Sequence, residues 1–143
     1  MLAFLLAIQL LAVPPVTTLP DPKLTPGDLL PVTGAKVCVP GYATAARKKV
    51  GWSRRVAVFM RYGYAAPLDG FEIDHLLSLE LGGSNAITNE WPQSYTGKWN
   101  AHMKDNLENI LHAAVCTTKT LTLPQAQMLI RTNWIAAYQK YMK

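Results

Sequence analysis

Apolar and polar positions along the chain form helical patterns on both sides of a shorter central stretch. Residues 52–62 place apolar side chains every three to four positions with arginines between them, so we expect a short amphipathic helix that ends at Gly63. Residues 98–115 repeat apolar side chains at the same spacing, which predicts a helix of about five turns. Thr122 and Gln125 have the spacing of a capping box and begin a last amphipathic helix.

The stretch between the first two helices predicts a β-hairpin. Residues 71–81 begin as a strand, the sequence Gly-Gly-Ser-Asn at 82–85 predicts a turn, and residues 88–91 predict a second strand. At 143 residues, the chain is long enough for one core. We therefore expect a single α+β domain over residues 37–143.

The N-terminal region has a different character. Residues 1–13 are apolar apart from Gln9, and this run is shorter than the roughly 20 residues that span a bilayer. We expect residues 1–20 to be a signal peptide or an N-terminal anchor, a secreted or periplasmic protein, and no stable membrane span in the mature chain. The proline-rich residues 21–36 predict an extended linker.

The chain has two cysteines, Cys38 and Cys116. An even number in an exported chain suggests one disulfide, which would tie the start of the domain to the far end of the predicted helix 98–115. Two free buried thiols are the alternative if the protein is cytosolic. The wide separation and the lack of a CxxC motif exclude a zinc site made by these cysteines.

Charge is distributed unevenly around a modest net value of +5. Acidic residues gather between positions 69 and 108, whereas the preceding segment is basic without an acidic residue. This asymmetry suits a polyanion that docks beside an acidic centre, although a solvated basic face is the alternative. The candidate phosphate-contacting residues in this segment are Arg47, Lys48, Lys49, Arg54, Arg55 and Arg61.

Most side chains suited to chemistry lie in the central stretch. Asp74 and His75 adjoin near the predicted strand end, Asn89 follows the turn, and His102 lies on the next helix. A hairpin packed on a helix can bring such carboxylate and imidazole groups onto one divalent ion, and a neutral His can activate water. Both Asp74 and His75 can reach one centre only if the strand bends or ends there.

The motifs IDHLLSLELGGSN, NEWPQ and NAHMKD resemble the HNH, or His-metal finger, endonuclease superfamily. They are more closely similar to small exported bacterial and phage proteins with the pattern DHLIPLELGG, NLWPQ and AHxKDxLE, over about residues 25–141. The chain departs from that pattern at Glu90, where Leu is common. The resemblance implies a ββα-metal core, flanked by the basic helix and the C-terminal helix, with a Mg²⁺ site that Mn²⁺, Zn²⁺ or Ni²⁺ could also fill.

The resemblance also implies roles for individual residues. His75 would be the general base, and Asn89 would hold the loop so that the His is oriented. Asp74 would bind the metal with His102, or with Asn100 if the helix register differs. Lys104 would contact phosphate; the alternative for it is an ion pair with a neighbouring acid on the helix surface.

These expectations define a metal-dependent endonuclease that hydrolyses phosphodiester bonds, in DNA rather than RNA, without a small-molecule cofactor. A non-catalytic domain that binds nucleic acid or another polyanion is the first alternative. An exported domain in which a metal serves stability alone is the second. The sequence leaves the oligomeric state open.

Overall fold

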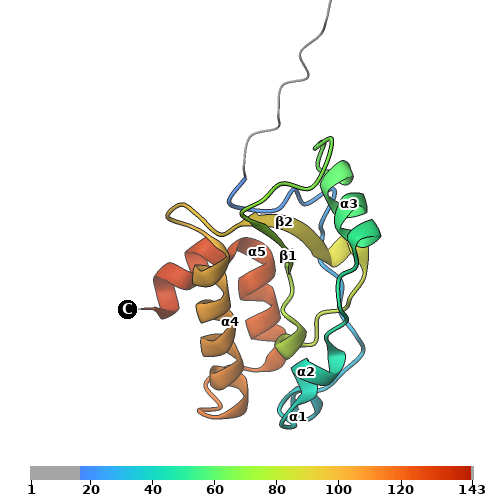
Figure 1. Cartoon of the computed structure of the whole chain (residues 1–143). Helices are drawn as coiled ribbons and strands as arrows, with labels where there is room; N and C mark the ends of the chain where they lie inside the picture. Colours follow the sequence, from blue (N-terminus) through green and yellow to red (C-terminus); the bar gives the residue numbers. More distant parts are fainter. Residues whose placement is uncertain (1–16, 143) are drawn as a thin grey trace, which may run out of the picture.

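The computed structural model describes residues 17–142 and has a mixed α+β architecture, which confirms the predicted class (Figure 1). The predicted export segment covers residues 1–20, and its residues 1–16 lie outside the described part of the chain. No helix within residues 17–142 is long and apolar enough to cross a membrane. The elements in chain order are α1 (Gly34–Val37), α2 (Tyr42–Ala46), α3 (Trp52–Arg61), β1 (Phe71–His75), the 3-10 turns η1 (Leu79–Leu81) and η2 (Ile87–Asn89), β2 (Glu90–Ser94), α4 (Ala101–Cys116) and α5 (Leu123–Tyr141).

The predicted hairpin is present as an antiparallel pair of strands, β1 and β2. Asp74 pairs with Trp91 and His75 pairs with Glu90, so β1 ends at the two residues singled out in the sequence. The second strand begins later than predicted, because η2 occupies the residues before Glu90. The hairpin lies between α3 and α4, so its two faces meet different helices (Figure 1).

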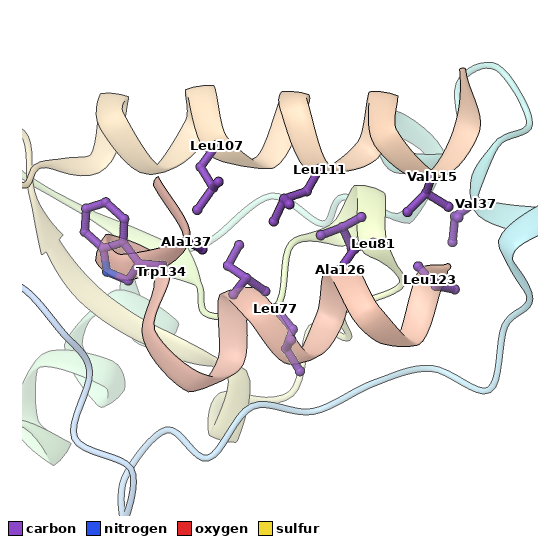
Figure 2. Close-up of a cluster of buried hydrophobic side chains, with 11 residues drawn as sticks. Val37, Leu77, Leu81, Leu107, Leu111, Val115, Leu123, Ala126, Trp134 and Ala137 are labelled. Carbon is purple, nitrogen blue, oxygen red and sulfur yellow. The ribbon is translucent and has the colours of Figure 1, made fainter. Parts of the chain in front are cut away.

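The hydrophobic core lies mainly between α4 and α5 (Figure 2). Leu107 and Leu111 point from α4 toward α5, where Ala126 and Trp134 meet them. Leu81, in η1, enters the same cluster and so anchors the segment that follows β1. This packing fixes α4 beside the end of β1, where the candidate site lies.

The two later helices begin with side-chain caps. Asn100 accepts a hydrogen bond from the Met103 N–H at 3.2 Å, so α4 begins at Ala101 rather than at residue 98. The predicted capping box of Thr122 and Gln125 is confirmed at the start of α5. Both helices therefore start where a polar side chain satisfies a free backbone N–H group.

The Cys38–Cys116 disulfide is confirmed, with 5.3 Å between the Cα atoms. It ties the end of α1 to the last residue of α4. The proline-rich segment, expected to be a linker, is docked on the domain instead. Thr25 is fully buried, and Leu29 forms a bridge with Gly83. Backbone pairing with the turn holds this segment, a contact that composition alone does not reveal.

Candidate active site

A polar pocket of about 350 Å³ opens where β1 ends beside η1 and α4. Its charged and titratable lining residues are Arg47, Glu72, Asp74, His75, Glu80, Asp105 and Glu108. Carboxylates outnumber cations in this lining, so the pocket is suited to a positively charged ligand. Asp74 and His75 both line this pocket because β1 ends at His75. From the sequence, both were expected to reach one centre only if the strand bent or ended at this point.

Three of these carboxylates form a tight group. Glu72, Asp74 and Asp105 each offer an oxygen atom, and these atoms all lie within 4.8 Å of one another. Burial raises the pKa of Glu72, and the charge on Asp74 raises it further. Burial and Asp74 raise the pKa of Asp105 in the same way. Burial is the larger cause of both shifts, and the oxygen donors of the group fit a hard divalent cation.

Lys104 lies beneath this group, with 1% of its surface exposed. Its Nζ is 2.6 Å from Asp74 Oδ2, pairs with Glu108 Oε1, and donates to the His75 carbonyl oxygen at 2.6 Å. Burial alone would lower the pKa of Lys104, but Asp74 and Glu108 outweigh it and raise that pKa. The ion pair with Glu108 forms, as the alternative expected, but it is buried. The ammonium group of Lys104 therefore binds groups inside the protein and is not presented to a phosphate.

His75 is fixed through one ring nitrogen. Its Nε2 lies 3.3 Å from Asn85 Oδ1 and 3.7 Å from Glu90 Oε1. Asn85 Nδ2 donates to the Ala46 carbonyl oxygen at 2.9 Å, so the amide oxygen faces the ring. This arrangement places the proton on Nε2 and leaves Nδ1 with its lone pair. Burial lowers the pKa of His75, although Asp74 and Glu90 oppose this, so the ring is neutral at neutral pH.

Glu90, where the chain departs from the motif that it resembles, has a defined partner. Arg54 Nε lies 2.6 Å from Glu90 Oε2, and Arg54 Nη2 donates to the Asn85 carbonyl oxygen at 2.7 Å. Glu90 is 3% exposed, so this pairing compensates a buried charge where the related pattern has Leu. Sequence reasoning missed the roles of Asn85 and Glu90. The unusual Glu90 beside the predicted catalytic His was the available signal.

Asn89 ties the turn to the strand end. It is fully buried, its Oδ1 accepts from the Leu77 N–H at 2.9 Å, and its Nδ2 donates to the carbonyl oxygens of Leu77 and Ser84 at 2.9 and 2.8 Å. These bonds span the loop between β1 and β2. Asn89 therefore holds the backbone at Leu77, two residues after His75, in one conformation.

The structure does not bring His102 or Asn100 into the acidic group. Asn100 caps α4 and also donates to the Gly97 carbonyl oxygen at 2.8 Å. His102 is exposed and stacks on Tyr95, with 5.3 Å between ring centroids. Both expected second ligands have other contacts, and Asp105 takes the helical position beside Asp74.

Two members of the acidic group, Glu72 and Asp105, were missed as ligands. Glu72 stands two positions before Asp74, and side chains two apart on a strand share a face. That spacing was a usable signal for Glu72. The place of Asp105 beside Asp74 depends on how α4 packs against β1. Core packing determines this position, so the local sequence contains no signal for Asp105.

The six basic residues predicted to contact phosphate fall into two sets. Arg54, Arg55 and Arg61 donate to backbone carbonyl oxygens of neighbouring segments, so α3 turns its arginines toward the protein. Arg47, Lys48 and Lys49 are exposed on the extended segment before α3. This second set is more exposed to a ligand from solvent than the arginines of α3.

No model of a protein family, no curated protein sequence and no solved structure matches this chain. The resemblance to HNH endonucleases therefore rests on the motif residues and stays a prediction. The disulfide is typical of proteins in oxidising compartments.

Proposed function

We propose that the chain is a divalent-metal-dependent phosphodiesterase of the HNH type that acts on nucleic acid, DNA rather than RNA. In this proposal β1, β2 and α4 form the ββα-metal core. The observation that carries it is the shared pocket of a neutral, fixed His75 and the carboxylates of Glu72, Asp74 and Asp105. A base beside a group of oxygen donors suits metal-dependent hydrolysis of a phosphodiester.

His75 acts as the general base. Its Nδ1 takes a proton from water, the water oxygen forms a bond to phosphorus, and the bond to the leaving 3′ oxygen breaks. The proton on Nε2 remains on the ring, which becomes an imidazolium. Glu90, 3.7 Å from Nε2, stabilises that positive charge, and Asn85 keeps the ring in the correct orientation.

Glu72, Asp74 and Asp105 would hold the metal. Because the donors are carboxylate oxygens, the group suits Mg²⁺ or Mn²⁺ better than Zn²⁺ or Ni²⁺. A bound divalent ion supplies positive charge at the scissile phosphate and at the leaving oxygen. Lys104 holds the carboxylate of Asp74 in place from the buried side.

Cleavage of a supercoiled plasmid tests this proposal. Wild-type protein should nick the plasmid with Mg²⁺ or Mn²⁺ and stop when the metal is chelated. His75→Ala should lose this activity, whereas Met128→Ala, a control at an exposed position of α5 outside the pocket lining, should keep it. Binding of DNA without cleavage by pure wild-type protein would favour the non-catalytic alternative.

A further inference from the structure

Trp52, the first residue of α3, is 69% exposed. The other three tryptophans contribute to the interior: Trp91 and Trp134 are fully buried, and Trp99 packs against Trp134 and Tyr138. An indole left in water has a free aromatic face on which another ring can stack.

A free basic segment leads to this side chain. Arg47, Lys48 and Lys49 are exposed on the extended stretch between α2 and α3, and none forms an ion pair within the described part of the chain. Three adjacent unpaired cations form a local positive charge beside an exposed Trp.

The same segment borders the candidate active site. Arg47 lines the acidic pocket, and Lys48 and Lys49 line a neighbouring cavity of about 250 Å³ together with Glu90. Arg47 and Trp52 are five positions apart, so the backbone between them spans at most about 18 Å. Stacked nucleotides rise about 3.4 Å each along one strand, so this length corresponds to about five nucleotides.

We propose that residues 47–52 dock a single strand of nucleic acid, with Arg47, Lys48 and Lys49 on its phosphates and Trp52 stacked on an unpaired base. This inference deepens the proposed function and rests on it for the identity of the substrate. The stacking requires a single strand, because a duplex buries the faces of its bases against one another. A run of three cations followed by an aromatic ring suits a backbone of phosphates whose bases are free to stack.

Binding of a twelve-nucleotide oligothymidylate, without metal, tests the docking surface directly. Tryptophan fluorescence should be quenched on binding, because Trp52 is the exposed indole. Trp52→Ala should bind roughly 5- to 150-fold more weakly, the range measured for loss of one stacked base. Trp52→Phe should retain most of the affinity, and Met128→Ala, a similarly exposed site on α5, should bind like wild type.

The lysines should set the salt dependence. For single strands the logarithm of affinity falls with the logarithm of salt by about 0.7 per neutralised phosphate. Lys48→Ala with Lys49→Ala should therefore reduce that slope by about 1.4. An unchanged slope would overturn the proposed phosphate contacts.

Cleavage of a p-nitrophenyl phosphodiester of thymidine separates this inference from the proposed function, because that substrate is too short to reach Trp52. Trp52→Ala should cleave it like wild type and should show a raised KM for the oligonucleotide. Equal binding of the oligonucleotide by Trp52→Ala and wild type overturns the inference, even if both proteins cleave it. Trp52-dependent binding to phosphatidylserine vesicles, with no binding to the oligonucleotide, also overturns it and assigns the surface to a membrane.

Discussion

Replacing Lys104 by Met removes a buried ammonium group while keeping most of the apolar stem. The carboxylates of Asp74 and Glu108 would then lie near each other without their shared cation, and the His75 carbonyl oxygen would lose its donor. Breaking a buried ion pair on one side costs about 3 to 5 kcal/mol. The side chains of Asp74 and Glu108 are 11% and 10% exposed, so water reaches them slightly and the lower end applies.

We therefore expect Lys104→Met to lower the free energy of unfolding by about 3 kcal/mol and Tm by about 10 °C. Urea denaturation followed by circular dichroism measures the first value, and Lys23→Met, at an exposed position, should change it by less than about 0.5 kcal/mol. Adding Glu108→Gln to Lys104→Met should cost less than the sum of the single changes, because one unpaired charge is removed. A loss below about 1 kcal/mol for Lys104→Met, or strict additivity in the double variant, would refute the buried network.

Three further predictions follow from the site and the disulfide. Glu90→Gln should lower kcat roughly tenfold with little change in KM, because the imidazolium of His75 loses a nearby charge; a wild-type kcat would remove Glu90 from the mechanism. Burial lowers the pKa of His75 from 6.5, so kcat at saturating Mg²⁺ should rise with pH to a plateau with its midpoint below pH 6.5, and a midpoint above pH 7 would contradict this sign. Replacing Cys38 and Cys116 by Ser should cost about 4 kcal/mol in urea denaturation, because the bridge closes a long loop; equal stability would show that it contributes nothing.

The parts of the fold that depend on local sequence could be predicted. The capping box at Thr122, the helix over Trp52–Arg61 and the strand pair around Asp74 follow from periodicity and turn residues. The disulfide followed from an even number of cysteines in a chain with an export-like start. The capping box, the helix and the strand pair depend on residues close in sequence. The disulfide could be predicted because the chain has two cysteines, which allow one pairing.

The start of α4 was placed too early, and this hid the capping role of Asn100. The resemblance had made Asn100 an alternative ligand, although Asn is a preferred N-cap residue. The buried face of α4 also contains Lys104 and Glu108 among its apolar residues. Lys104 was assigned to the surface. It pairs with Glu108 within α4, but its second partner, Asp74, lies on β1 and cannot be inferred from the helix alone.

The contacts of the α3 arginines could not be predicted either, because their partners lie on other segments of the chain. Their charge predicted a phosphate-binding face, but Arg54, Arg55 and Arg61 satisfy carbonyl oxygens of loops far away in the sequence. A helical pattern gives the face on which a side chain lies. It does not give the loops that pack over that face.

Metal affinity and cleavage rate, measured on the same variants, separate the role of the carboxylates in holding a metal from the role of His75 as the base. Asp105→Asn should weaken Mn²⁺ binding in calorimetry by roughly tenfold or more and should recover much of its cleavage when Mn²⁺ is saturating. His75→Ala should bind Mn²⁺ within about twofold of wild type and should cleave about 10²- to 10⁴-fold more slowly. Cleavage by His75→Ala at the wild-type rate, or no Mn²⁺ binding by the wild-type protein, would contradict the account.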